Sequence, residues 1–174
     1  PMKLELTTLL LITALFTVSV KAQESAHSIV EKALSQAKTE NKNVFVKYSA
    51  SWCGWCKKMS AQMKSEELKA FFEDNYVIVQ LVAKESAKNK QLENPGSNEL
   101  MASQGGDKAG LPFWVILDKD GKLIEDSFNS EGDNLGCPAS GDEIPEFIAK
   151  LKKTSKLTDM QLGKIAEVFA AKWL

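Results

Sequence analysis

Apolar and polar residues follow two different patterns along the chain. Short apolar runs rich in β-branched and aromatic residues, bounded by turn residues, predict β-strands. Three such runs are 44–48, 76–83 and 113–117. The sequence Asp-Lys-Asp-Gly at 118–121 is typical of a hairpin turn and predicts a fourth strand over 122–128.

Other segments have apolar residues at helical spacing or begin with an N-cap signal. Ser28 and Glu31 form a capping-box pattern, and similar patterns begin at Ser140 and Thr158. Ser65 is a candidate cap for a further short helix. The expected helices are 28–41, the stretch through Lys57 to Met63, 66–74, 98–104, 140–153 and 158–173.

The order of these elements predicts the fold class. Strand–helix–strand units favour parallel strands, and the hairpin adds an antiparallel strand. We therefore expect an α/β fold with a central mixed β-sheet, helices on both faces and an extra C-terminal helix. The 174 residues suffice for one domain with its own hydrophobic core.

The first 22 residues have a different pattern from the rest of the chain. Lys3 is followed by an apolar stretch, and Val20-Lys21-Ala22 resembles a small-x-small cleavage site. This is typical of a secretory signal peptide over 1–22, with a mature domain over 23–174 in the periplasm or outside the cell. We expect no stable membrane insertion after cleavage, and an uncleaved amphipathic helix or membrane anchor is the open alternative.

Charge argues against nucleic acid as a partner. The chain has 22 basic and 23 acidic residues, a net charge of −1 with histidine neutral, and every basic residue is a lysine. A near-neutral chain has no global field that attracts polyanions. Arginine, the usual residue for bidentate contacts with phosphates and bases, is missing from the sequence.

Two of the three cysteines have the spacing C-x-x-C, as Cys53 and Cys56. A predicted strand leads into this segment and a predicted helix leads out, so Cys53 is expected at a helix N-terminus. The unpaired N–H groups and the helix dipole would stabilise a thiolate there. Cys56 is three residues further on, within reach of a disulfide. Cys53 is then the more exposed attacking thiolate and Cys56 the resolving thiol.

The neighbours of the pair complete the expected active-site loop. Trp52 and Trp55 are expected to flank the sulfurs and partly exclude water, and Gly54 to keep the turn open. Lys57, with Lys58 after it, adds positive charge. Three alternatives compete: a structural disulfide, half of a zinc site, and a haem attachment site, which would need histidine where Lys57 stands. We expect no metal and no cofactor beyond the Cys53–Cys56 disulfide itself.

These residues resemble a known family. The run Trp52 to Lys57, followed by Gly110-Leu111-Pro112-Phe113 and by the hairpin at 118–121, is similar to the thioredoxin superfamily. More narrowly, it resembles exported bacterial thioredoxin-like proteins with a W-C-G-W-C-K motif. The resemblance spans about residues 28–153 and implies a thioredoxin-like fold and a protein-disulfide oxidoreductase activity.

The resemblance also implies roles for single residues. Pro112 would be a cis-proline beside the cysteine pair, and Leu111 would offer backbone groups to an extended substrate. The superfamily has a buried acid six residues before the nucleophile, where Lys47 stands in this chain. Lys47 or a water would then assist proton transfer, or the second step would be slower. Alternatively, Lys47 extends from the edge of the sheet into solvent.

These observations leave two main classes of function open, and a third that is less favoured. The first is an enzyme that exchanges disulfides with protein or peptide thiols, with reduction slightly favoured. An exported reductase would need a membrane electron donor, because its compartment has no reducing buffer. The second is a non-catalytic thioredoxin-like module that binds peptides at Pro112, which Lys47 and the long 84–110 segment leave open. The third is a zinc-binding structural protein, for which only His27 and Cys137 remain as further ligands.

Overall fold

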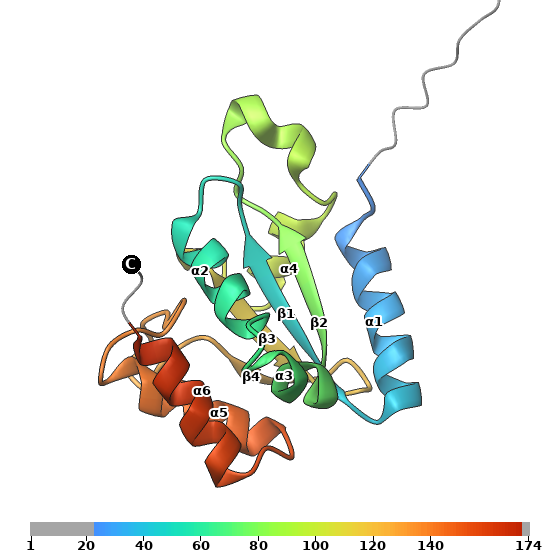
Figure 1. Cartoon of the computed structure of the whole chain (residues 1–174). Coiled ribbons are helices and arrows are strands. Elements are labelled where there is room, and N and C mark those ends of the chain that lie inside the picture. The colour runs from blue at the N-terminus through green and yellow to red at the C-terminus, as the bar shows by residue number, and fades with distance from the viewer. Residues whose placement is uncertain (1–22, 172–174) are drawn as a thin grey trace, which may run out of the picture.

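The computed structural model describes residues 23–171, and its centre is a four-stranded mixed sheet (Figure 1). The strand order is β2-β1-β3-β4. β1 pairs with β2 in parallel and with β3 antiparallel, and β4 adds antiparallel to β3. The strands are β1 (Asn43–Ser49), β2 (Tyr76–Val82), β3 (Phe113–Leu117) and β4 (Leu123–Asp126). The expected mixed α/β sheet is confirmed.

Six α-helices and one 3-10 helix surround the sheet in the described residues. The helices are α1 (Ala26–Glu40), α2 (Gly54–Met63), α3 (Lys69–Asn75), η1 (Ala87–Leu92), α4 (Ser97–Ser103), α5 (Glu143–Thr154) and α6 (Asp159–Ala170). The extra C-terminal helix is therefore present as α6. The expected signal peptide over 1–22 and Trp173 lie outside the described residues. Among the helices of residues 23–171, none has the length and apolarity that crossing a membrane requires.

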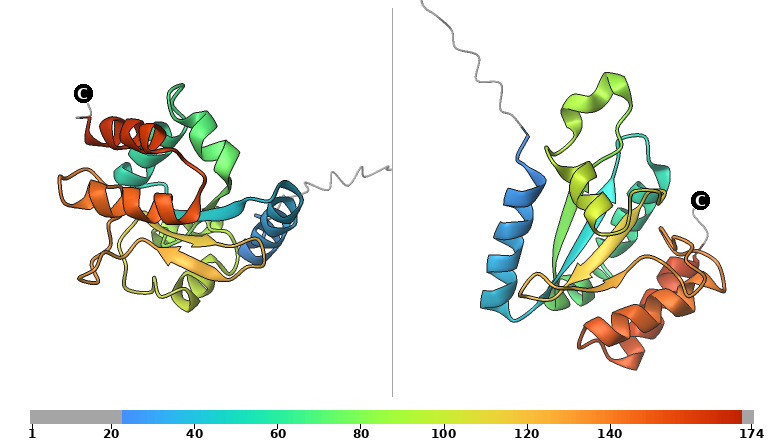
Figure 2. Two further views of the ribbon diagram at one scale, coloured as in Figure 1. Left: turned by 90° about the horizontal axis from the view of Figure 1, so that it is seen from below. Right: turned by 180° about the vertical axis from the view of Figure 1, so that it is seen from behind.

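Each face of the sheet has its own hydrophobic core, because side chains alternate along β1 and β3. Phe45, Trp114 and Ile116 pack under α2, α3, α5 and α6. On the other face, Val46 and Val115 belong to the core formed with α1 and α4. Figure 2 shows the C-terminal helices on one side of the sheet and α4 on the other. Burial on both faces explains why these two strands are apolar runs.

Two of the expected helix caps are wrong. The first helix begins earlier, where the side chain of Ser25 accepts from the backbone N–H of Ser28. Ser25 competes successfully because α1 extends its apolar stripe back to the fully buried Ala26. Ser65 does not cap α3 either: its hydroxyl is buried without a hydrogen-bond partner. A turn over 65–68 precedes α3, which starts only at Lys69.

The other two capping boxes form as predicted. Thr158 accepts from the N–H of Gln161, whose side chain accepts in return from the N–H of Thr158. Ser140 and Glu143 exchange the same two bonds, at 3.2 and 3.0 Å, and α5 begins at Glu143. These boxes start the two helices that cover the Trp114 face of the sheet.

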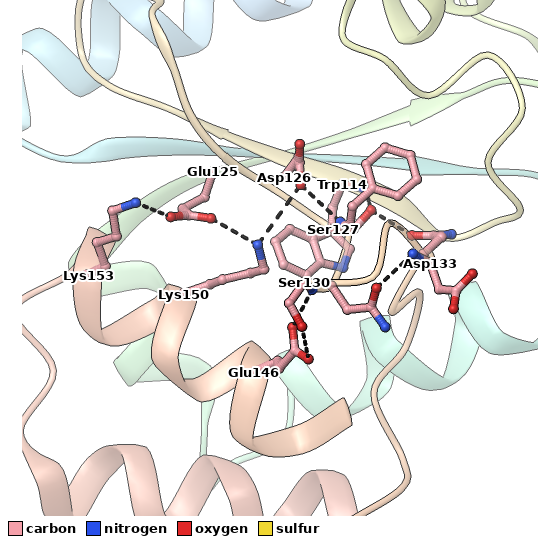
Figure 3. A network of polar contacts seen from close by, with 12 residues as sticks. Trp114, Glu125, Asp126, Ser127, Ser130, Asp133, Glu146, Lys150 and Lys153 are labelled. Carbon is pink, nitrogen blue, oxygen red and sulfur yellow. Dashed lines mark hydrogen bonds and ion pairs between the residues drawn. The ribbon is translucent and has the colours of Figure 1, made fainter. Parts of the chain in front are cut away.

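α5 is also held to β4 by a partly buried ion network (Figure 3). Lys150 Nζ lies 3.0 Å from a Glu125 carboxylate oxygen, and Lys153 binds the other oxygen. Burial alone would raise the pKa of Glu125, but the hydrogen bonds from the two lysines outweigh it and lower the pKa. At the other end of the network, Glu146 accepts from the N–H of Ser130 at 3.0 Å.

We expect Lys150→Met to lower the free energy of unfolding by about 1–2 kcal/mol, because Glu125 loses a buried partner. Lys152→Met is the matched control on the same helix. Lys152 pairs with Asp159 at 2.6 Å, but the two side chains are 62% and 83% exposed, so its loss should cost less than about 0.5 kcal/mol. Urea denaturation measures both values. Equal losses in the two variants would contradict the stabilising role of the network.

Candidate redox site

Cys53 and Cys56 form a disulfide at the point where β1 leads into α2. Their Cα atoms are 5.3 Å apart, within the range that a disulfide spans. The strand ends at Ser49 and the helix begins at Gly54, so the pair occupies the strand-to-helix junction that the sequence predicted. The disulfide is the oxidised state of the site.

Cys53 is the N-cap of α2. Its sulfur accepts a hydrogen bond from the backbone N–H of Cys56 at 3.1 Å. When the disulfide is reduced, this donor and the positive end of the helix dipole would stabilise a thiolate on Cys53. The local sequence therefore favours ionisation of the first cysteine over the second.

Both cysteines are buried, Cys53 at 3% exposure and Cys56 at 0%. Cys53 is the more exposed of the two, as expected, although the difference is small. Trp52 and Trp55 are 58% and 55% exposed, so each indole keeps more than half of its surface in solvent, and the expectation that they partly exclude water from the sulfurs stays a prediction. Ala50 and Leu111 pack against the sulfur pair. The tryptophans form an exposed aromatic rim around the disulfide.

Each of the two tryptophans in this rim makes a further contact that fixes its indole ring. Trp52 donates from its indole N–H to the carbonyl oxygen of Lys84 at 3.0 Å. The ammonium of Lys58 lies 4.9 Å from the centre of the Trp55 ring, a cation–π contact. Lys57 is exposed and Lys58 is buried, so of the two expected charges only one packs into the site.

The 84–110 segment braces the cysteine loop through a carboxylate, Glu85, that sequence motifs do not reveal. Glu85 is 5% exposed, and its two oxygens accept from the N–H and the hydroxyl of Ser51 at 2.5 and 2.8 Å. The predicted pairing of the two strands could have pointed to this contact. β1 and β2 are parallel neighbours, with Ser49 opposite Val82, so the residues after both strands meet at one edge of the sheet.

We expect Glu85→Ala to lower the free energy of unfolding by about 2–3 kcal/mol, because two donors of Ser51 lose a charged acceptor. Glu99→Ala, at an exposed position of α4, is the control and should change stability by less than about 0.5 kcal/mol. Chemical denaturation of the oxidised protein gives both numbers. A loss in Glu85→Ala no larger than in the control would show that the brace is not stabilising.

Leu111 and Pro112 lie beside the disulfide, joined by a cis peptide bond as the resemblance implied. They line a groove of about 410 Å³ that begins at Trp55 and continues along the loop before α5. Asn134, a second residue without a sequence signal, fixes this groove. Its side-chain amide donates to the carbonyl oxygens of Gly110 and Pro112 at 3.0 and 3.1 Å.

Lys47 lies on the central strand and is buried, with 2% exposure. The alternative that it extends from a sheet edge into solvent is therefore wrong, because β1 has neighbours on both sides. Its ammonium donates to the carbonyl oxygen of Cys56 at 3.3 Å and to the hydroxyl of Ser60. Desolvation lowers the pKa of Lys47 to about 8, and the charge of Lys64 acts in the same direction.

The third cysteine and the single histidine form no metal site with the pair. Cys137 is a free, buried thiol that contacts a side-chain oxygen of Gln62 at 3.4 Å. Burial raises the pKa of this thiol to about 11. His27 is exposed on α1. Within the described part of the chain, no three histidine, cysteine or acidic side chains come together as metal ligands would.

A C-x-x-C disulfide at a helix start, beside a cis-proline on a mixed sheet, is the arrangement of a thioredoxin-like thiol–disulfide oxidoreductase. A family model described as thioredoxin-like matches residues 25–119, more than half of the chain. The protein therefore belongs to the thioredoxin-like family. A search of curated proteins finds no match.

Several solved structures are similar to this chain. A disulphide isomerase from Xylella fastidiosa Temecula1 superimposes with a TM-score of 0.52 at 20% identity, over 83% of this chain and 88% of that one. A protein named DsbH oxidoreductase gives a TM-score of 0.48 at 24% identity, over 78% and 85% of the two chains. The oxidised C-terminal domain of DsbD from Neisseria meningitidis gives 0.47 at 18% identity, over 76% and 99%. At these identities, the first structure supports the fold alone.

Proposed function

We propose that this protein exchanges disulfides with protein or peptide substrates through Cys53 as nucleophile and Cys56 as resolving thiol. The observation that carries the proposal is the bond from the Cys56 N–H to the Cys53 sulfur at the start of α2. This arrangement favours a thiolate on the first cysteine, and the second is already within bonding distance of it.

The chemistry takes two steps. The Cys53 thiolate attacks a substrate disulfide, a Cys53–substrate bond forms, and the other substrate sulfur leaves and takes a proton. Cys56 then loses its proton and attacks Cys53, which releases the second substrate thiol and restores the Cys53–Cys56 disulfide. The groove along Leu111 and Pro112 would hold the substrate segment, and the exposed Trp52 and Trp55 would contact its side chains.

We propose that the protein reduces substrate disulfides and that it does so in an exported compartment. The direction rests on the thioredoxin-like motif, and the compartment on the signal-peptide pattern of residues 1–22, which leaves 23–174 as the mature domain. A membrane electron donor would then return the disulfide to the dithiol. Mass spectrometry of the protein isolated from its host tests the compartment: a mature N-terminus at Gln23 supports export, and an intact leader opposes it.

Trapping the covalent intermediate tests the roles of the two cysteines. In Cys56→Ser, attack by Cys53 still occurs but resolution does not, so a mixed disulfide with a substrate should accumulate and disappear on treatment with dithiothreitol. Cys53→Ser should give no such species, because Cys56 lies inside α2 and lacks the N-cap position that stabilises the attacking thiolate. Accumulation through Cys56 instead would reverse the two assignments.

The same experiment separates the enzyme from the second candidate, a peptide-binding module. A module would bind peptides in the Pro112 groove equally well with both cysteines replaced by alanine, and its Cys56→Ser variant would form no covalent product. The exchange proposal requires the covalent product.

A further inference from the structure

Lys47 is a buried cation without a negative partner in the oxidised protein. Within residues 23–171, no carboxylate forms an ion pair with it, and its ammonium is bonded only to the Cys56 carbonyl and the Ser60 hydroxyl. A buried charge of this kind is unfavourable unless a compensating charge is close. Reduction of the disulfide creates such a charge, because it places a thiolate at the start of the helix whose first turn Lys47 contacts.

The ammonium is connected to solvent on the side away from the groove. Ser60 donates to the side-chain oxygen of Gln80 at 3.2 Å, and Gln80 is exposed on β2. These residues line a pocket of about 470 Å³ that shares no residue with the groove at Pro112. Lys47 can therefore exchange its proton with solvent while a substrate covers the disulfide.

Other charged groups near Lys47 do not replace the missing partner. Glu40 faces the same pocket but is paired with Lys42 at 2.6 Å, and Lys64 adds a like charge. The remaining titratable groups around it are Glu73 and Tyr76 at the pocket and Cys137 from the loop before α5. Glu73 is paired with Lys69 at 3.9 Å. Burial raises the pKa of both Tyr76 and Cys137, to about 12 and about 11, so neither supplies a negative charge at neutral pH.

We propose that Lys47 is a positioning residue of the redox site, whose ammonium stabilises the thiolate of the reduced cysteine pair and so favours reduction of the disulfide. This inference rests on the proposed function, because it assumes that the pair cycles. With glutathione as reductant, two glutathione thiols supply two electrons, the Cys53–Cys56 bond breaks and one glutathione disulfide forms. Of the two protons, one remains on Cys56 and the other is released as Cys53 ionises.

The test is the equilibrium constant between the full-length protein and glutathione at neutral pH. Lys47→Met keeps the length of the side chain and removes the charge, so the constant for reduction should fall about tenfold, which corresponds to a potential about 30 mV more negative. Lys64→Met is the matched control. It removes an exposed charge from the same pocket and should shift the constant less than about twofold.

A second variant separates the effect of the charge from the effect of the hydrogen bond. It also provides a test if Lys47→Met does not fold. Lys47→Gln is neutral but retains a donor for the Cys56 carbonyl. If the charge acts, its constant falls as in Lys47→Met. If the hydrogen bond alone acts, its constant stays at the wild-type value, and the inference is wrong.

The pH dependence of this equilibrium constant distinguishes a charge effect from a purely structural role of Lys47, which would not depend on its protonation. Lys47 loses its charge as pH rises through its pKa of about 8, so the difference between wild type and the neutral variants should shrink above that pH. Thiolate absorbance of the reduced proteins should show a higher Cys53 pKa in both variants. Unchanged thiol pKa values would overturn the inference alone, whereas a wild-type disulfide that never equilibrates with glutathione would overturn the proposed function.

Discussion

Cys53→Ser should lower the rate of insulin disulfide reduction, with dithiothreitol as electron donor, by on the order of 10³-fold or more. The serine hydroxyl remains un-ionised at neutral pH, so the N–H of Cys56 and the dipole of α2 have no thiolate to stabilise. Cys56 cannot take over the attack efficiently, because it lies inside α2 and lacks the N-cap position that stabilises a thiolate on Cys53. Insulin precipitation followed by turbidity measures the rate.

Cys137→Ser is the control for this experiment, since it also removes a sulfur but leaves the pair intact. Cys137 is buried, bonded to Gln62 and unpaired in the structure, so we expect its variant to retain more than about half of the rate. Substantial activity in Cys53→Ser would contradict the assignment of the nucleophile. An equal loss in both variants would point instead to a general effect of cysteine replacement.

Phe147→Ala should lower the free energy of unfolding by about 3–5 kcal/mol, the largest stability effect that we expect of a single side chain. Phe147 on α5 is fully buried, and its ring centre is 5.5 Å from that of Trp114 and 5.0 Å from that of Phe169. It therefore joins the sheet to both C-terminal helices. Truncation would leave a cavity at the point where these three elements meet.

Met160→Ala provides the comparison for Phe147→Ala. Met160 is on α6 and is 85% exposed, so its truncation should change stability by less than about 0.5 kcal/mol. Equilibrium denaturation by urea gives both values. A loss below about 1 kcal/mol for Phe147→Ala would mean that α5 and α6 are not part of the cooperative core.

Local signals in the sequence were sufficient for the sheet. β1 and β3 are buried on both faces, so their apolar runs are continuous enough to be recognised, and the hairpin at 118–121 defines the entry into β4. The capping boxes at Ser140 and Thr158 could be recognised because both partners of each box are only three residues apart in the sequence. Ser28 does not cap the helix. Ser25 lies one turn earlier and is followed by the fully buried Ala26, so the helix begins there.

The cysteine pair was predictable because its two residues are close in the sequence. Glu85 and Asn134 were harder to find, since each acts on a loop more than twenty residues away through a hydrogen bond that only the tertiary structure brings about. Trp52 and Trp55 illustrate a different limit. Sequence places them beside the sulfurs, but their exposure depends on which residues pack against the disulfide, and these are Ala50 and Leu111.

The central claim is that the Cys53–Cys56 bond opens and closes reversibly, and a redox titration tests it most directly. The wild-type protein is equilibrated with glutathione at a series of ratios, free thiols are alkylated, and the masses of the oxidised and reduced forms are compared. The account predicts a single two-electron transition in which Cys53 and Cys56 become alkylated together. A pair that stays bridged at every ratio, or that gains one alkyl group at a time, would contradict it.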